Sequence, residues 1–439
     1  MNSDPILAQA AACIGEDNRV LVAYSGGVDS TVLLHLMMRL RQLRPELRVR
    51  AVHVHHGLSR FADEWALHCE QQCAQWKIPL DVVRVQVKKA HISLEASARD
   101  ARYHAIGSRL EAGESLVTAQ HLDDQCETVL LALKRGSGPA GLAAMTARMP
   151  FMRGQQVRPL LYVSRAEIEA YAALHQLSWV EDDSNSDPRF DRNFLRLQVI
   201  PELTARWPHF GEAVARSAAL CGEQEELLDE LLMESLQTLL DDDESIDIAG
   251  LQQMSEVKRQ AILRRWFACL GALMPSREQL QSLWYQVAMA RQDAEPVLNI
   301  QQWQVRRFKQ RLYLLPSMRS LADSVQMWDG LRPLVLPDNL GELRLQEGGL
   351  SVRAPLPAEF VSVRFRAQGR FHIIGRNGSR QIKKIWQERG IPPWLRDRTP
   401  MLFYGETLIA AFGVFVTKEG QPQPDQPQWQ IYWAKPWLC

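Results

Sequence analysis

The chain has 439 residues, of which 46% are apolar and 23% charged, and its formal net charge is zero. This composition is typical of a globular protein, and the length predicts two to four domains. We find no apolar run long enough to span a bilayer and no signal peptide at the start, so we expect no membrane partner. The seven scattered cysteines argue against a disulfide framework and favour a reducing, cytoplasmic compartment.

A strand, a glycine turn and a helix are predicted near the start of the chain. The apolar run Val20–Ala23 predicts a buried strand, and the amphipathic stretch after Ser30 predicts a helix. The turn between them reads SGGVDS, and its N–H groups with the helix N-terminus would form an anion site suited to phosphate. Asp29 in the turn predicts a divalent metal between its carboxylate and the phosphates. The turn lacks the Lys of a Walker A motif.

Strands and helices continue to alternate up to residue 119. Further strands are predicted at 49–54, 81–87 and 115–119, and helices at 65–76 and 94–110. This alternation predicts an α/β fold with a doubly wound parallel sheet, in which ligands bind at the carboxyl ends of the strands. We therefore expect the SGGVDS turn, the segment His53–Gly57 and the segment after Ala119 to meet at one edge.

The segment after the fourth predicted strand reads HLDDQCET, residues 121–128. Asp123 and Asp124 stand at a predicted helix start, where they could simply cap the helix and complement its dipole. His121 and Asp124 are three residues apart and face the same way. The alternative is that Asp123, Asp124 and Glu127 hold magnesium or orient an amine. A basic, glycine-rich turn that includes Gly136 follows this helix and could close over a nucleotide.

Two arginines further along the chain are spaced to point in one direction. Arg192 and Arg196 are four residues apart on a predicted helix. A planar guanidinium group binds two phosphate oxygens at once, so this pair favours a phosphate-binding role. The alternative is that both arginines form salt bridges to the acidic loop that precedes them, residues 182–187.

The remaining chain is predicted to form a helical middle region and a small basic α+β domain. A long helix is expected at 211–240, with a stripe of Leu227, Leu231 and Met233 to Leu236 that more often faces a core than a partner groove. Residues 251–315 are expected to continue as helices. Residues 364–398 contain ten Lys or Arg and two acidic residues, whereas residues 223–247 contain eleven acidic residues and no Lys or Arg. This segregation favours a nucleic-acid surface; a solvated face or a contact between the two blocks is the alternative.

Five motifs occur in an order that resembles one enzyme family. They read SGGVDS, AVHVHHGL, HLDDQCET, LKRGSGPAGL and EDDSNSDPRFDRNFLR. The first resembles the PP-loop of the ATP pyrophosphatases, and the set resembles the tRNA(Ile)-lysidine synthetases, with a departure at Gln120. The resemblance implies a PP-loop catalytic domain at 1–210, a helical tRNA-binding domain at 211–320 and a basic C-terminal tRNA-binding domain at 321–439.

The resemblance also implies a reaction. ATP would adenylate the C2 oxygen of the wobble cytidine in the CAU anticodon of tRNA(Ile), with release of pyrophosphate. Free L-lysine would then attack C2 and displace AMP, and the product, lysidine, would change codon reading from Met to Ile.

The catalytic and ATP-binding residues follow from matching the motifs to positions of this chain, and the tRNA-binding residues are taken from the basic block at 364–398. The residues expected to bind ATP are Ser25, Gly26, Gly27, Val28, Asp29, Ser30, His53 and Gly136. The residues expected to act in catalysis are Asp29, His121, Asp124, Arg192 and Arg196. Mg²⁺ is expected on Asp29 and Asp123, and Asp124 is expected to orient or deprotonate the lysine amine. The residues expected to bind tRNA are Arg366, Arg370, Arg376, Lys383 and Lys384.

Three other functions remain as alternatives. A tRNA thiolase with the same ATP loop would need a catalytic cysteine or a cluster site, for which Cys69, Cys73 and Cys126 are not arranged. A small-molecule amide synthetase would need an ammonia source and would not need a basic C-terminal domain. A non-catalytic nucleotide-binding module is disfavoured by the dense titratable groups at one sheet edge. The sequence leaves open whether the protein forms a homodimer, and whether Asp123 or Asp124 meets the metal.

Overall fold

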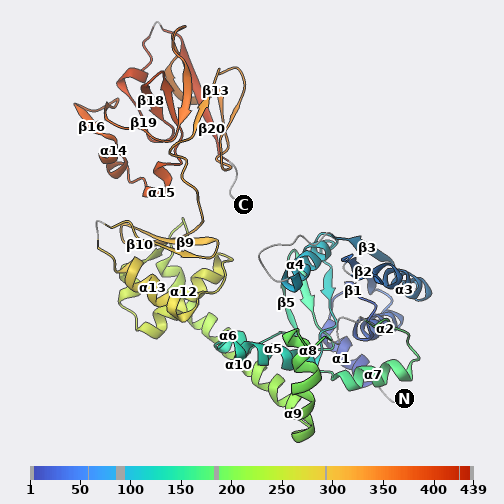
Figure 1. Cartoon of the computed structure of the whole chain (residues 1–439). Coiled ribbons are helices and arrows are strands. Elements are labelled where there is room, and N and C mark those ends of the chain that lie inside the picture. The colour runs from blue at the N-terminus through green and yellow to red at the C-terminus, as the bar shows by residue number, and fades with distance from the viewer. Residues whose placement is uncertain are drawn as a thin grey trace. The chain divides into compact units, whose positions relative to one another are not determined.

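The structure, a computed structural model, describes residues 4–57, 59–85, 94–181, 187–291, 294–424 and 426–435. The chain divides into two compact units, residues 1–231 and 232–439 (Figure 1). In the part of the chain that is described, no helix has the length and apolar character needed to cross a membrane. Most of the acidic loop considered above, residues 182–186, lies outside the described residues.

The first unit alternates strands and helices as predicted (Figure 1). Its strands are β1 (Arg19–Ala23), β2 (Arg48–His55), β3 (Leu80–Arg84), β4 (Ser115–Val117), β5 (Arg148–Phe151) and β6 (Gly154–Val157). Its helices are α1 (Pro5–Ile14), α2 (Val28–Leu43), α3 (Ala62–Gln75), α4 (Leu94–Gly107), α5 (Leu122–Lys134), α6 (Pro139–Leu142), α7 (Arg165–Leu174), α8 (Asp191–Phe194), the π-helical η2 (Leu195–Val199), α9 (Ile200–Arg206) and most of α10 (Phe210–Leu239).

The six strands form one sheet in the order β3-β2-β1-β4-β6-β5. All neighbours are parallel except β5, which pairs antiparallel with β6. Val20 and Val22 of β1 pack in the core that α1, α2, α3 and α7 cover, whereas Leu21 packs with Ile106 of α4 in a second core. Burial on both faces explains why β1 is apolar throughout, and it confirms the doubly wound sheet.

The second unit begins with the end of α10, and several short helices follow it along the chain. They are α11 (Ile248–Gln252), α12 (Glu256–Cys269), α13 (Arg277–Ser282) and the π-helical η3 (Leu283–Ala288). The prediction of helix up to residue 315 is wrong, because three strands follow η3 and join the earlier strand β7 in an antiparallel sheet of order β7-β10-β9-β8. Its strands are β7 (Ile246–Asp247), β8 (Val297–Ile300), β9 (Trp303–Phe308) and β10 (Arg311–Pro316). Gln301 and Lys309, with φ of 54° each, begin the two connecting turns without a glycine to signal them.

The predicted core stripe of α10 is wrong in part. Its end at Leu236 is buried, but Leu227, Leu231 and Met233 are exposed, and Leu232 is buried instead with the helices and sheet of the second unit. Leucines occupy adjacent positions along this helix, so the sequence alone does not fix which face is apolar. The true face is shifted by about one residue, or roughly 100° around the helix axis.

The C-terminal part of the second unit is the predicted α+β region. Its strands are β11 (Val325–Met327), β12 (Leu334–Val335), β13 (Glu342–Arg353), β14 (Val361–Arg364), β15 (Arg370–His372), β16 (Ser379–Gln381), β17 (Met401–Tyr404), β18 (Thr407–Ala411), β19 (Phe415–Val416) and β20 (Gln428–Ala434). Its helices are α14 (Ile382–Glu388), α15 (Pro393–Arg396) and the 3₁₀ turn η4 (Lys418–Gly420). Phe365, Trp386 and Trp394 are buried, so these aromatic residues build the core and are not available to stack on bases.

Candidate active site

The SGGVDS turn connects β1 to α2 and is held by its own hydrogen bonds. The Ser30 hydroxyl donates to the carbonyl oxygen of Gly27 at 3.0 Å and lies 3.0 Å from Ser25 Oγ. Thr31 Oγ1 donates to the carbonyl oxygen of Gly26 at 3.3 Å. Gly27 is the N-cap of the 16-residue helix α2, whose first N–H groups have no partner within the helix. The turn is therefore shaped in advance to bind an anion at this helix start.

Gly26 is required by the shape of this turn. Its φ is +90°, and an added Cβ would lie 3.0 Å from both Cys69 Sγ and Val180 Cγ2. At Gly27, φ is −72°, and the atom nearest to an added Cβ would be Ser25 Oγ, at an ordinary contact distance of 3.6 Å. We expect Gly26→Ala to lower the free energy of unfolding by about 1–3 kcal/mol, and Gly27→Ala by less than about 1 kcal/mol. Urea unfolding of both variants measures the difference; equal losses would contradict this account of the turn.

Three carboxylates surround His121, which lies at the N-cap of α5. Its Nε2 is 3.7 Å from Asp29 Oδ1 and 3.5 Å from Asp124 Oδ2, and its Nδ1 is 3.5 Å from Asp123 Oδ2. Burial alone would lower the pKa of His121, but the carboxylates, Asp123 foremost, outweigh it and raise that pKa. The turn after β1 and the segment after β4 therefore meet, as the parallel sheet predicts.

Asp124 has a structural contact as well as a place in this cluster. Its Oδ2 accepts a hydrogen bond from the backbone N–H of His121 at 3.1 Å, which is the capping role considered above. Its Oδ1 accepts from Arg196 Nη2 at 3.0 Å. One carboxylate thus caps α5 and binds an arginine at the same time, so capping does not exclude a chemical role.

Arg192 and Arg196 point in the same direction, as their spacing predicts. Arg196 Nε donates to Glu127 Oε1 at 2.7 Å, and Arg192 Nη1 lies 3.8 Å from Glu127 Oε2. The Glu127 side chain is completely buried, and burial raises its pKa although Arg196 opposes the effect. Asp187 is the one residue of the acidic loop 182–187 that the structure describes, and it forms a salt bridge with Arg189. The two arginines are therefore held by α5 beside the carboxylate cluster.

Arg165 also belongs to the site, and the sequence did not predict it. Its Nη1 donates to both carboxylate oxygens of Asp29 at 2.8 Å, and its backbone N–H donates to Asp123 Oδ2 at 2.9 Å. Burial raises the pKa of Asp29, while His121 and Arg165 oppose that rise. The sequence does contain the capping box of Ser164 and Glu167 that starts α7. It contains no signal for a contact across 136 positions of the chain.

Asp29 and Asp123 fit a magnesium ion that arrives with a nucleotide. Mg²⁺ prefers carboxylate oxygens and usually takes one or two from the protein, with water and substrate phosphates as its other ligands. Among the described residues, no group of three or more His, Cys, Asp or Glu could hold a metal by itself. Asp29 and Asp123 could therefore supply two of the ligands of an ion whose other ligands are water and substrate phosphates.

Two residues outside the SGGVDS turn, His53 and Gly136, are also expected to bind ATP. His53 is buried, and its Nδ1 lies 2.9 Å from the carbonyl oxygen of Tyr24, immediately before the turn. This contact supports the base of the turn. Gly136, with φ of +67°, lies in the turn after α5, next to the ion pair that Lys134 forms with Asp191 at 2.7 Å. Contacts of His53 and Gly136 with ATP stay predictions.

Three cysteines considered for the thiolase alternative do not form a reactive site. Cys69, Cys73 and Cys126 are free and buried. Burial raises the pKa of each thiol to about 12. A thiol with such a pKa is a poor nucleophile near neutral pH, which argues against the thiolase alternative.

Three of the five residues expected to bind tRNA converge on one hollow of the second unit. Arg366, Arg370 and Lys383 line an open hollow of about 340 Å³ between the segment before β15 and the start of α14. Arg376 instead forms an ion pair with Glu388, and Lys384 is not among the residues that line the hollow. Within the basic block, Arg366, Arg370 and Lys383 therefore line the hollow, whereas Arg376 is occupied by its ion pair.

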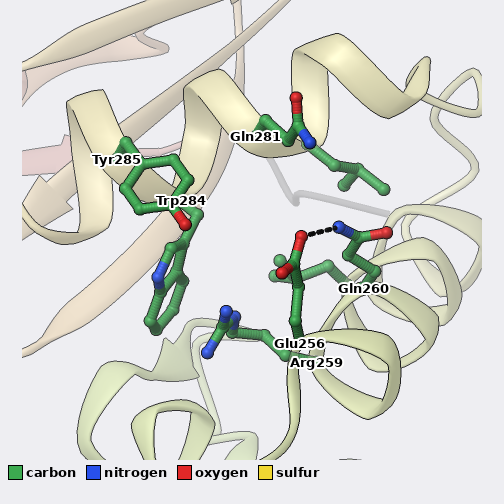
Figure 2. Close-up of a pocket in the computed structure, with 8 residues that line it drawn as sticks. Glu256, Arg259, Gln260, Gln281, Trp284 and Tyr285 are labelled. Atoms are coloured by element: carbon green, nitrogen blue, oxygen red, sulfur yellow. Dashed lines mark hydrogen bonds between the residues drawn. The ribbon is translucent and has the colours of Figure 1, made fainter.

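A second hollow lies between α12 and the helices α13 and η3 (Figure 2). The Arg259 guanidinium lies 3.8 Å from the centre of the Trp284 ring, and Gln260 donates to Glu256 Oε1 at 2.9 Å. With a volume of about 10 Å³ it has room for about one water molecule. It is too small to enclose a nucleotide, so the carboxylate cluster stays the candidate active site.

Comparison with known proteins gives matches along the whole chain. Residues 5–203 match the PP-loop domain, residues 246–313 the TilS substrate binding domain, and residues 361–433 the TilS substrate C-terminal domain. Among solved structures, a U34-tRNA thiolase NcsA from Methanococcus maripaludis is 16% identical, with a TM-score of 0.41 over 49% of this chain and 77% of that chain.

Curated relatives are much more similar. A tRNA(Ile)-lysidine synthase of Edwardsiella ictaluri (strain 93-146) is 60% identical over 439 residues, which is 100% of both chains. One of Serratia proteamaculans (strain 568) is 57% identical over 99% of this chain and 100% of its own. The chain belongs to the tRNA(Ile)-lysidine synthase family.

Proposed function

We propose that this enzyme ligates free L-lysine to C2 of the wobble cytidine in the CAU anticodon of tRNA(Ile), through an adenylated tRNA. Lysidine formation with ATP as substrate follows from the family to which the chain belongs. The observation that carries the detailed proposal is the meeting of the SGGVDS turn with His121, its three carboxylates and two arginines.

The first step would transfer AMP to the cytidine. N–H groups of the turn and the Ser25 and Ser30 hydroxyls would bind the ATP phosphates. The C2 oxygen attacks the α-phosphorus, and the bond from that phosphorus to the bridging oxygen of pyrophosphate breaks. Mg²⁺ on Asp29 and Asp123 would neutralise charge on the departing pyrophosphate. Arg192 or Arg196 would stabilise negative charge that develops at phosphorus, because both lie beside the carboxylate cluster.

The second step would join lysine to the cytidine. The free amine attacks C2, and the C–O bond to AMP breaks, so the former C2 oxygen leaves with AMP. Asp124 is proposed to hold the lysine amine and accept the proton that it loses. The hydrogen bonds from the His121 N–H and from Arg196 fix the position of the Asp124 carboxylate before lysine arrives.

The basic hollow of the second unit is the proposed tRNA-binding surface, and it gives a prediction. We expect Ala at Arg366, Arg370 and Lys383 together to raise the KM for tRNA at least about tenfold and leave the KM for ATP unchanged. The salt dependence of tRNA binding should also flatten, by a slope of about one for each phosphate that the variant no longer neutralises. Steady-state kinetics measures the two KM values, and filter binding at several salt concentrations measures the salt dependence.

A matched control for this prediction lies in the same basic block. Arg376 is occupied by its ion pair with Glu388, so Arg376→Ala should change the KM for tRNA by less than about threefold. Unchanged tRNA affinity in the triple variant would show that the hollow is only a solvated face.

Product analysis tests the proposed reaction. The purified enzyme is incubated with ATP and Mg²⁺, and tRNA(Ile) or lysine is omitted in turn. We expect AMP and pyrophosphate only when tRNA is present, and lysidine only when lysine is present as well. Formation of ADP, or steady turnover of ATP without tRNA, would contradict the proposal.

A further inference from the structure

One residue holds both carboxylates that the proposed metal needs. The Arg165 side chain donates to both oxygens of Asp29, and its backbone N–H donates to Asp123. His121 is a further neighbour of both carboxylates, 3.7 Å from Asp29 and 3.5 Å from Asp123. Asp29 is therefore already paired with positive charge before any ligand binds.

We propose that Arg165 is a positioning residue that occupies the Asp29 carboxylate and weakens the binding of a free divalent cation before ATP arrives. This inference rests on the proposed roles of Asp29 and Asp123 as metal ligands. A guanidinium group that uses both oxygens of a carboxylate leaves little room for a second cation on them, and like charges in a partly buried site repel. A free divalent cation must therefore displace Arg165 from Asp29 at a cost in free energy.

ATP would change this competition between Arg165 and the cation, because its triphosphate brings negative charge to the turn that contains Asp29. Arg165 is the first residue of α7, and its side chain is 38% exposed, so the guanidinium can rotate away while its backbone stays on Asp123. Triphosphate oxygens in the adjacent turn would offer the released guanidinium new partners of the geometry it prefers. Release of Asp29 is thus coupled to the arrival of the nucleotide, and metal and ATP bind together.

The Arg165 side chain is itself oriented by an ion pair within α7. Its neighbour Glu169, which accepts from Arg165 Nε at 2.7 Å, holds the other side of the guanidinium and directs Nη1 toward Asp29.

The test measures binding of Mn²⁺, a probe for Mg²⁺, to the full-length enzyme by electron paramagnetic resonance, with and without a non-hydrolysable ATP analogue. Without nucleotide, we expect Arg165→Gln to bind Mn²⁺ about tenfold more tightly than the wild type, since one charge-assisted hydrogen-bonded partner of Asp29 is removed. Arg165→Lys keeps the positive charge and should stay close to the wild type. With the analogue, the advantage of Arg165→Gln should disappear.

Two further variants complete the design. Arg148→Gln removes an arginine that pairs with Asp17 away from the site, and it should leave Mn²⁺ affinity unchanged. In the double variant Asp29→Asn with Arg165→Gln, the gain should vanish, because the carboxylate that Arg165 occupies is gone.

The outcomes separate the inference from the proposed function. Equal Mn²⁺ affinity of the wild type and Arg165→Gln without nucleotide would overturn the inference and leave the metal role of Asp29 intact. Undiminished Mn²⁺ binding by Asp29→Asn in the presence of the ATP analogue would overturn the metal role itself.

Discussion

Asp29→Asn is expected to lower the rate of AMP formation by about a thousandfold or more, while tRNA affinity stays within about twofold. Asn has nearly the same shape as Asp and can still accept a hydrogen bond from Arg165, so the turn should keep its fold. What is lost is the negative charge that the proposed Mg²⁺ requires, and metal stabilisation of a leaving pyrophosphate contributes several kcal/mol. Burial raises the pKa of Asp29, so removing the charge should not destabilise the folded protein.

The measurement is AMP release from ATP in the presence of tRNA, together with the dissociation constant for tRNA. Asp17→Asn provides the control, because Asp17 is an acidic residue of the same unit that pairs with Arg148. AMP formation by Asp29→Asn at a rate near that of the wild type would refute the metal role of Asp29.

Arg196→Met is expected to reduce both stability and activity. Glu127 would keep its buried negative charge with only Arg192 nearby, at 3.8 Å. Breaking a buried ion pair by removing one partner costs about 3 kcal/mol in the free energy of unfolding. The same change removes the hydrogen bond that Arg196 donates to Asp124 and the positive charge proposed to stabilise the reacting phosphorus, so AMP formation should fall at least about a hundredfold.

A double variant separates these two effects. Glu127→Gln combined with Arg196→Met removes the isolated carboxylate, so the free energy of unfolding should recover by about half or more of the loss. Activity should not recover, because the arginine is still missing. Urea unfolding and AMP release distinguish the two quantities. Recovery of activity along with stability would mean that Arg196 acts only by compensating Glu127.

The sequence predicted the parts of the fold and site that local pattern determines. The apolar strand, the glycine turn and the helix of residues 19–43 were readable because each has its own signature, and the parallel sheet then brought His121 to Asp29. The four-residue spacing of Arg192 and Arg196 fixed their shared direction in the same way.

The errors and omissions have a common physical cause, which is that tertiary packing decided them. The hairpins of β8, β9 and β10 turn at Gln301 and Lys309, residues that carry no turn signal. On α10, leucines at adjacent positions hid which face is buried. The contact of Arg165 with Asp29 joins α7 to the start of α2, and no local spacing encodes it.

The central claim is that the SGGVDS turn directs transfer of adenylate, and not of a phosphoryl group, to tRNA. The most direct test incubates the enzyme with tRNA(Ile), Mg²⁺ and no lysine, using ATP labelled on either the α- or the γ-phosphorus. The account predicts that the α-label becomes attached to tRNA and that the γ-label leaves as pyrophosphate. Attachment of the γ-label to tRNA, or its release as inorganic phosphate with ADP, would contradict the account.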